Sequence, residues 1–257
     1  HVQLTTKAEG KGKVLVDGEA VASAASTDGL VAYYPFNGNA NDESGNGNHG
    51  TVNGATLAAD RNGNSAKAYS FDGGGHILLN EELAKYSPTT NQDMTISFWA
   101  SNGSEGWVIS QYGDNYLVIL QKNSFQLIGN GTGSPGTGYI RDSYSRILNS
   151  WNHWIFQFKD GNNQCLVYIN GKIESVGQAY LRSSTTSVPI YIGASYHNMP
   201  EKFSGELDDI RIYNRVLNET EIADLYAAEW SKTYESGTEV VLSATPAAGW
   251  EFSHWSG

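Results

Sequence analysis

Short apolar segments alternate with glycine- and asparagine-rich turns through the central part of the chain. Each segment is too short for an ordinary helix, and turn residues bound it on both sides, which is the pattern of β-strands. Repeated short strands at this spacing indicate an all-β fold, an antiparallel β-sandwich. The predicted strands are Leu30–Phe36, Ala68–Phe71, His76–Leu79, Met94–Ala100, Trp107–Gln111, Tyr116–Gln121, Ser124–Gly129, Trp154–Lys159, Cys165–Ile169, Ile190–Gly193 and Gly205–Tyr213.

Two local signals add detail to this pattern. Asn170-Gly171 follows an apolar strand and predicts a two-residue hairpin turn. Asn218 followed by Glu221 is a capping-box pattern, which predicts the start of a helix. Its apolar positions Ile222, Leu225 and Tyr226 fall on one face, so we expect one short helix that closes the sandwich.

The two ends of the chain form a second, smaller pattern. Residues 1–28 contain two short strands, Val2–Thr6 and Val14–Gly18, around a glycine-containing turn. An isolated hairpin is marginally stable in water and needs partners. The strand at Glu239–Ala244 and the aromatic alternation at Trp250–Trp255 supply them. We therefore predict a split small β domain, residues 1–28 and 230–257, with the sandwich of residues 29–229 inserted in it.

Composition excludes several classes of protein. The formal net charge of −11 argues against a nucleic-acid partner, because such binders are typically basic. No segment approaches the roughly 18 consecutive apolar residues of a membrane span. A lone cysteine, Cys165, rules out an internal disulfide, and its strand context predicts a buried thiol. No initiating Met or signal peptide is present, so we expect this chain to be a piece of a longer protein.

The polar loop Asn37–Gly50 is the most specific chemical feature. Its Asp, Asn and backbone carbonyl groups are hard oxygen ligands, of which calcium takes six to eight. Its glycines let several carbonyls point inward together. Asp and Asn in such turns also serve simply to accept hydrogen bonds from the backbone, which is the alternative interpretation.

Four stretches of the inserted segment carry a resemblance to a known family. They are Leu30–Gly50, Ala68–Gly73, Trp151–Trp154 with Tyr168–Lys172, and Phe203–Leu217 with Glu221-Ile222. In this order they resemble the laminin-G-like, concanavalin A-like lectin/glucanase family of secreted bacterial proteins. The resemblance implies a jelly roll of two curved antiparallel sheets packed face to face, on a secreted or cell-surface protein.

The chain ends resemble a different family. Gly237–Pro246 and Gly249–Gly257 are similar to the bacterial repeat domain related to the B-repeats of internalins, whereas the match of the N-terminal part is loose. This resemblance assigns the split small domain to a repeat of bacterial surface proteins.

The resemblance to the lectin-like family implies a calcium site with a particular ligand set. Asp42 would provide the side-chain ligand, and Asp208 or Asp209 would complete the site. Carbonyls would come from Asn37, Asn39, Gly47 and His49. His49 is disfavoured as a transition-metal ligand because no second His or Cys lies nearby at ligand spacing.

Catalytic patterns are missing from the sequence. Glucanases with this jelly roll carry Glu-Xaa-Asp-Xaa-(Xaa)-Glu on one strand, and this chain has no such motif. The acidic residues of Glu206–Asp209 have the wrong spacing for the carboxylate pair of a glycosidase. No Ser/His/Asp arrangement is legible either. We therefore predict that the chain is not an enzyme.

Aromatic and polar residues between the predicted strands suit carbohydrate binding, since sugar rings stack on aromatic faces and polar groups take their hydroxyls. The alternative is that these aromatic side chains only pack in the fold. The candidate ligand-binding residues are Trp107, Gln111, Tyr112, Tyr116, Arg141, Tyr144, Tyr196 and His197.

The leading hypothesis is a carbohydrate-binding or adhesive module of a larger secreted or cell-surface bacterial protein, with calcium as a structural ion. Its partner would be a polysaccharide or glycan, with a protein as the second option. The rival is a structural spacer or protein-binding stalk without a sugar site. A third reading is an accessory domain that shapes the cleft of an attached hydrolase.

Overall fold

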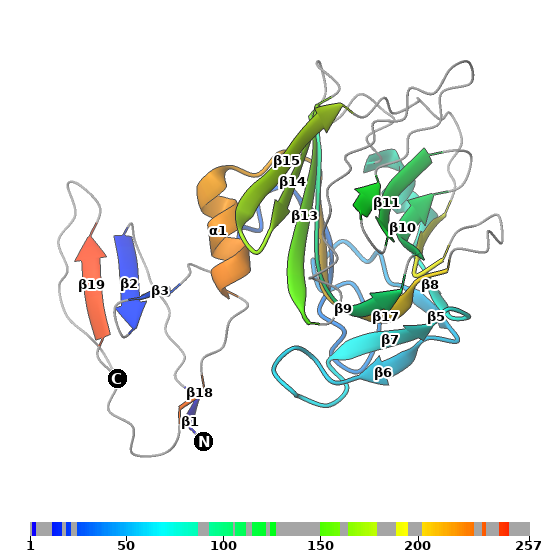
Figure 1. Cartoon of the computed structure of the whole chain (residues 1–257), viewed down its shortest axis with the longest axis horizontal. Coiled ribbons are helices and arrows are strands. Elements are labelled where there is room, and N and C mark those ends of the chain that lie inside the picture. Colours follow the sequence, from blue (N-terminus) through cyan, green and yellow to red (C-terminus); the bar gives the residue numbers. More distant parts are fainter. Residues whose placement is uncertain are drawn as a thin grey trace. The chain divides into compact units, whose positions relative to one another are not determined.

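In a computed structural model the chain divides into two compact units (Figure 1). One unit comprises His1–Ser26 and Asn218–Gly257, and the other is Thr27–Leu217. The second boundary thus lies at residue 217, before the helix, whereas the sequence pattern placed it at 229. The structure describes residues 2–3, 12–16, 19–21, 25–86, 93–104, 106–111, 115–121, 124–126, 150–159, 164–178, 189–194, 202–228, 233–234 and 242–246.

The larger unit is a sandwich of two β-sheets, and the pairings between its described strands are antiparallel. One sheet has the order β12-β11-β10-β16-β8-β5; the other has the order β15-β14-β13-β9-β17-β7-β6, with β4 paired to β17. The predicted antiparallel β-sandwich is confirmed. The strands of the six-stranded sheet are β5 (Thr51–Asn53), β8 (His76–Leu78), β10 (Gly106–Gln111), β11 (Asn115–Gln121), β12 (Ser124–Gln126) and β16 (Ile190–Ile192).

The eight-stranded sheet forms the other layer (Figure 1). A short 3₁₀ helix, η1 (Glu81–Tyr86), follows β8. The strands of this sheet are β4 (Leu30–Tyr34), β6 (Thr56–Ala58), β7 (Ala68–Asp72), β9 (Met94–Ser104), β13 (Asn152–Lys159), β14 (Gln164–Ile169), β15 (Lys172–Gln178) and β17 (Ser204–Tyr213).

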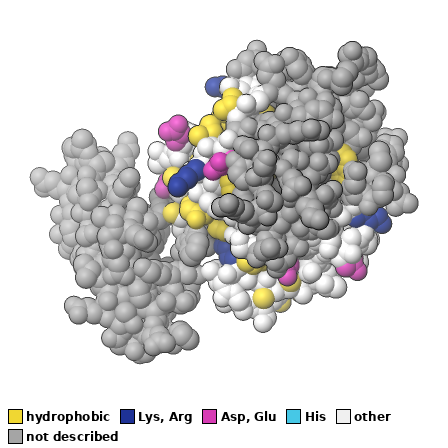
Figure 2. Space-filling view, in the orientation of Figure 1, with side chains coloured by type: hydrophobic (Ala, Val, Ile, Leu, Met, Phe, Trp, Pro, Cys, Tyr) yellow, Lys and Arg dark blue, Asp and Glu magenta, His cyan; other side chains and the backbone are white. Residues whose placement is uncertain are grey.

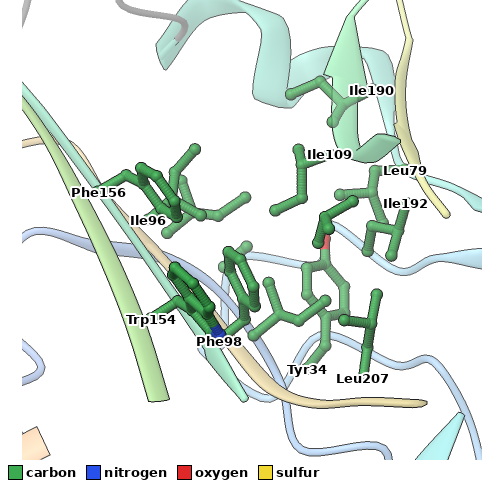
Figure 3. Close-up of a cluster of buried hydrophobic side chains, with 14 of the residues drawn as sticks. Tyr34, Leu79, Ile96, Phe98, Ile109, Trp154, Phe156, Ile190, Ile192 and Leu207 are labelled. Atoms are coloured by element: carbon green, nitrogen blue, oxygen red, sulfur yellow. The ribbon is translucent and has the colours of Figure 1, made fainter. Parts of the chain in front are cut away.

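Apolar side chains from the facing sides of the two sheets form one core (Figure 3). Ile96 and Phe98 of β9 and Phe156 of β13 meet Ile109 and Ile192 of the six-stranded sheet. The Phe98 and Phe156 rings stack with centroids 5.9 Å apart. Cys165 is fully buried in the same cluster, as predicted. Residues between these core positions along each strand therefore lie on the outer faces of the sheets.

The predicted hairpin turn is present between β14 and β15. Asn170 and Gly171 both have positive φ, 51° and 74°, as a turn of two left-handed residues requires. Within the sandwich, three of the described strands were not predicted: β5, β6 and β15. On β15 the apolar Ile173 and Val176 are 53% and 56% exposed, so burial does not impose an apolar pattern on this edge strand.

Hydrogen bonds and an ion pair join the first and last residues of the sandwich. The backbone N–H of Asn214 donates to the carbonyl of Gly29 at 2.9 Å. Arg215 donates from Nε to the carbonyl oxygen of Asp28 at 2.8 Å and lies 3.1 Å from its carboxylate. We call these four residues the terminal clamp.

In the smaller unit, strands from the two chain ends pair. β2 (Gly12–Val16) lies between β3 (Glu19–Val21) and β19 (Leu242–Pro246), and β1 (Val2–Gln3) pairs with β18 (Thr233–Tyr234). Segments more than 200 residues apart thus share two small sheets.

The helix α1 (Glu219–Ala228) begins where the capping box predicts. Asn218 N–H donates to Glu221 Oε2 at 2.9 Å, and Glu221 N–H donates to Asn218 Oδ1 at 3.0 Å. Among the described residues no helix has both the length and the apolar character needed to span a membrane.

Candidate functional site

A buried ionic cluster lies on the outer face of the eight-stranded sheet. Asp208 and Arg211 of β17 pair with Trp99 and Ser97 of β9, which alternate with the core residues of that strand. Their side chains therefore leave the sheet on the side away from the core. We define the ionic cluster as Tyr33, Arg61, Asp208, Asp209 and Arg211.

Arg61 joins the two acidic residues of the cluster. Its Nη1 lies 2.8 Å from Asp208 Oδ2 and 2.8 Å from Asp209 Oδ2. The side chains of Arg61, Asp208 and Asp209 are only 11%, 3% and 12% exposed. These charges are thus largely removed from water, and an unpaired charge in such a buried place is strongly unfavourable.

The remaining carboxylate oxygens of the cluster also accept hydrogen bonds. Asp208 Oδ1 accepts from the backbone N–H of Asp209 at 2.8 Å. Asp209 Oδ1 accepts from the Tyr33 hydroxyl at 2.9 Å, with Arg211 Nη2 3.8 Å away. The Arg211 guanidinium also lies 4.1 Å from the centre of the Tyr33 ring. All four carboxylate oxygens therefore have a donor.

A β-bulge brings two consecutive carboxylates to one cation. Between Asp208 and Arg211 the strand β17 advances three residues while β9 advances only from Trp99 to Ser97. The extra residue, Asp209, has φ of 48°, a left-handed conformation that is rare outside glycine. In a regular strand Asp208 and Asp209 would point to opposite faces, so the bulge is what creates the acidic pair.

A short loop between β6 and β7 presents Arg61. Asp60 Oδ1 accepts from the backbone N–H groups of Asn62 and Asn64, both at 2.8 Å. Asp60 Oδ2 accepts from Asn64 Nδ2 at 2.9 Å. This Asx-type turn holds the backbone around Arg61 in place before its side chain reaches the sheet.

Aromatic rings complete the surroundings of Arg61. Its guanidinium lies 4.7 Å from the centre of the Trp99 ring, which stacks on His153 with centroids 5.1 Å apart. His153 Nε2 lies 2.7 Å from Ser97 Oγ. Burial lowers the pKa of His153 well below its usual value, and the charges of Arg211 and Arg61 lower it further. The imidazole is therefore neutral and adds no charge to the cluster.

Burial likewise governs the acidic and phenolic groups. It raises the pKa of Asp208 and the neighbouring Asp209 carboxylate raises it further, whereas Arg61, 2.8 Å away, lowers it and favours the ionised carboxylate on which the ion pair depends. Burial also raises the pKa of Tyr33, against the influence of Arg211. Tyr33 thus stays a hydrogen-bond donor to Asp209.

The Asn37–Gly50 loop is organised around Asp42, which is 6% exposed. Its Oδ1 accepts from the backbone N–H groups of Tyr33 and Ser44, and its Oδ2 accepts from that of Asn48, each at 2.9 Å. Burial acts to raise the pKa of the Asp42 carboxyl, but these hydrogen bonds outweigh it and the pKa is lowered.

The residues whose carbonyls are predicted to bind calcium use their side chains for contacts within the protein. Asn37 Oδ1 accepts from Lys67 Nζ at 2.6 Å, and Asn39 Oδ1 accepts from the N–H of Asn41 at 2.8 Å. His49 Nδ1 accepts from the N–H of Asp42 at 3.1 Å. Gly47 has φ of 75° and serves the turn.

The predicted side-chain ligands of the calcium site lie apart from each other. Asp42 contacts the backbone nitrogen of Tyr33, whereas Asp209 contacts its hydroxyl, so the two carboxylates lie at opposite ends of one tyrosine. Asp208 already binds the cationic side chain of Arg61. Within the described ranges no three His, Cys, Asp or Glu side chains come together as a metal site.

The predicted carbohydrate-binding residues fall on the six-stranded sheet or outside the described residues. Trp107 is 3% exposed, so its ring packs in the fold and offers no free face to a sugar. Gln111 lies on β10 opposite Asn115 and Ile190, and Tyr116 lies on β11 opposite Ser110. Tyr112, Arg141, Tyr144, Tyr196 and His197 lie outside the described residues.

Two aromatic residues that the sequence did not single out lie on the outer face of this sheet. Tyr191 of β16 pairs with Leu78 and Ser110, and it alternates with the core residues Ile190 and Ile192. The rings of Tyr191 and His76 have centroids 5.6 Å apart and planes tilted by 50°. Both are only partly buried. We call them the outer aromatic pair.

Polar groups lie beside the outer aromatic pair. Asn53 pairs with His76 across β5 and β8, and Thr51 pairs with Leu78; both are exposed. Burial and the charge of Lys202 lower the pKa of His76, which keeps the ring neutral near pH 7. On the face shown in Figure 2, acidic and basic side chains of the described surface are scattered and form no patch of one sign.

Two family models match the sequence. One, described as the concanavalin A-like lectin/glucanases superfamily, matches residues 71–223, which is more than half of the chain. The other, a divergent InlB B-repeat domain, matches residues 225–257. The two resemblances expected for the middle and the end of the chain are therefore confirmed.

Solved structures share the sandwich fold. The binding domain of Paraclostridial Mosquitocidal Protein 1 is 21% identical with a TM-score of 0.62, over 78% of this chain and 52% of that one. Domain 4 of AbnA, an extracellular arabinanase from Geobacillus stearothermophilus solved with arabinotriose, is 20% identical with a TM-score of 0.54, over 77% and 98%.

One curated relative is a much longer protein. Adhesion G-protein coupled receptor V1 of Danio rerio is 27% identical over an alignment of 179 residues that covers 64% of this chain. The matched part is only 3% of the receptor, and the chain spans about half of the mosquitocidal binding domain.

Proposed function

The chain belongs to the concanavalin A-like lectin/glucanase superfamily, and on this basis we propose that its sandwich is a non-catalytic carbohydrate-binding module of a larger secreted or cell-surface protein. The observation that carries the proposal is the match to domain 4 of the arabinanase. This chain covers 98% of that domain, which was solved with a bound oligosaccharide. A sandwich of this size thus suffices to hold a sugar without a further domain.

The outer aromatic pair is our candidate for the sugar-contacting surface. Pyranose and furanose rings present C–H groups that stack on aromatic faces, and neighbouring polar groups take the hydroxyls. Tyr191 and His76 provide partly exposed rings, and the side chains of Asn53 and Thr51 lie beside them. A neutral His76 can both donate and accept a hydrogen bond.

Glycan-array binding of the 257-residue chain tests the proposal. We expect selective binding to a group of related oligosaccharides, with arabinotriose included as one probe. Tyr191→Ala should weaken it at least about tenfold, because stacking and an anchoring contact are lost together. Leu57→Ala is the matched control, since Leu57 is also exposed, at 43%, but lies on β6 of the other sheet.

The outcomes separate the proposal from its rival. A folded chain that binds no glycan would favour the spacer or protein-binding stalk. Binding that persists in Tyr191→Ala and His76→Ala would retain the carbohydrate-binding function but move the site to another surface.

A further inference from the structure

Arg61 occupies the position at which the acidic pair of β17 would otherwise need a cation. The bulge directs Asp208 and Asp209 to the same side, and their Oδ2 atoms both lie 2.8 Å from one nitrogen, Arg61 Nη1. Two carboxylates that converge in a buried place repel each other unless a positive charge lies between them. Here a side chain provides that charge.

The charge balance of the cluster leaves no demand for a divalent ion. Two carboxylates face two guanidinium groups, those of Arg61 and Arg211. A calcium ion takes six to eight oxygen ligands, and it would have to displace a donor from each carboxylate oxygen. It would also enter next to two fixed positive charges, which is electrostatically unfavourable.

The loop that carries Arg61 is built to keep the guanidinium in place. The Asp60 turn fixes the backbone, and Trp99 lies against the guanidinium at 4.7 Å. A cation held by a covalent tether and a stiff turn is already positioned before the contacts form, so it loses little freedom in binding.

We infer that Arg61 is an internal replacement for a divalent cation at the Asp208–Asp209 pair, so that this pair needs no calcium to hold the sandwich together. The inference concerns the ionic cluster alone and does not depend on carbohydrate binding. It replaces the calcium site expected from the family resemblance with a permanent ion pair.

Thermal unfolding of the whole chain in millimolar calcium and in EDTA is the first test. We expect the same Tm in both conditions for the wild-type chain. A Tm that falls in EDTA and recovers with calcium would overturn the inference, because a metal ion would then hold the fold.

Charge-removing variants provide the second test. Arg61→Met should lower the Tm by roughly 10 °C, because a buried carboxylate pair loses its counter-charge. Adding Asp208→Asn to Arg61→Met should restore at least about half of that loss, since the repulsion is removed with the charge. If the double variant is no more stable than Arg61→Met, packing and not charge explains the role of Arg61.

A control variant at Lys67 and the response of Arg61→Met to calcium test the inference further. Lys67→Met removes an exposed cation from the same loop. Among the described residues Lys67 Nζ donates only to Asn37 Oδ1, at 2.6 Å, so the Tm of this variant should barely change. In Arg61→Met the acidic pair is open to another cation, so calcium should raise its Tm by several degrees, whereas the same addition leaves the wild type unchanged.

Discussion

Tyr33 donates a hydrogen bond from its hydroxyl to Asp209 Oδ1 at 2.9 Å, although 176 residues separate the two in sequence. The backbone nitrogen of the same tyrosine donates to Asp42. One residue of β4 thus connects the Asn37–Gly50 loop with the ionic cluster. It joins the first and last strands of the sandwich beyond their backbone pairing.

Removing that hydroxyl tests the connection. We expect Tyr33→Phe to lower the free energy of unfolding by about 1–2 kcal/mol, because Asp209 Oδ1 loses its close donor while the ring still faces Arg211. Urea unfolding at pH 7 measures the change. Tyr69→Phe on β7 is the control, since within the described part of the chain no hydrogen bond of its hydroxyl is found. Equal losses in the two variants would contradict the prediction.

Asp42 organises its loop as an acceptor for backbone N–H groups. Asp42→Ala leaves the N–H groups of Tyr33, Ser44 and Asn48 without that acceptor, and we expect a loss of about 2–4 kcal/mol in the free energy of unfolding. Asp42→Asn keeps one oxygen and should fall between Asp42→Ala and the wild type. Chemical denaturation in calcium and in EDTA should give the same values; a loss that appears only with calcium would identify Asp42 as a metal ligand.

The Asp42 carboxyl group also makes the free energy of unfolding depend on pH in the acid range. The pKa of Asp42 in the folded chain lies below its ordinary value of 3.8, so the unfolded state binds more protons as the pH falls. The stability that this group contributes is complete above roughly pH 5 and is lost as the pH falls through the folded pKa. Unfolding measured from about pH 6 to about pH 2.5 should therefore show a shallower acid-side decline for Asp42→Asn than for the wild type. Identical slopes would contradict this.

Two glycines with nearly equal φ angles allow the cost of backbone strain to be measured separately from the cost of side-chain crowding. Gly193 and Gly63 have φ of 83° and 81°, so alanine at either position incurs a similar backbone cost of about 1 kcal/mol. At Gly193 an added Cβ would lie 2.3 Å from the Phe71 ring, whereas nothing lies within 4 Å at Gly63. Gly193→Ala should lower the Tm further than Gly63→Ala, because overpacking at Gly193 costs about a further 1–3 kcal/mol in the free energy of unfolding. Differential scanning fluorimetry of the two variants is sufficient, and equal Tm values would refute the crowding argument.

Most strands were predictable because burial on one side imposes a repeating apolar pattern. Ile96, Phe98 and Phe156 display that pattern, and Asn170-Gly171 marks its hairpin by local backbone chemistry alone. The strand β15 escaped prediction because it lies at a sheet edge with Ile173 and Val176 exposed. Where burial does not select the residues, the sequence carries little strand signal.

The site was harder to predict because its geometry depends on distant contacts. Asp208 and Asp209 look like metal ligands in sequence, and only the bulge and Arg61, 147 residues away, show how their charge is balanced. Asp42 has the same residue type and loop context whether its oxygens face a cation or backbone N–H groups. Arg61 itself lies in a polar turn that resembles any solvated loop.

The terminal clamp has a mechanical consequence. Because Gly29 and Asn214 are bonded to each other, the chain enters and leaves the sandwich at one point. Tension that reaches the two ends of the sandwich would load Asp28, Gly29, Asn214 and Arg215 and bypass the strand ladders of the sandwich. While the clamp holds, the force would pass through these four residues, and the sheets of the sandwich would carry no load.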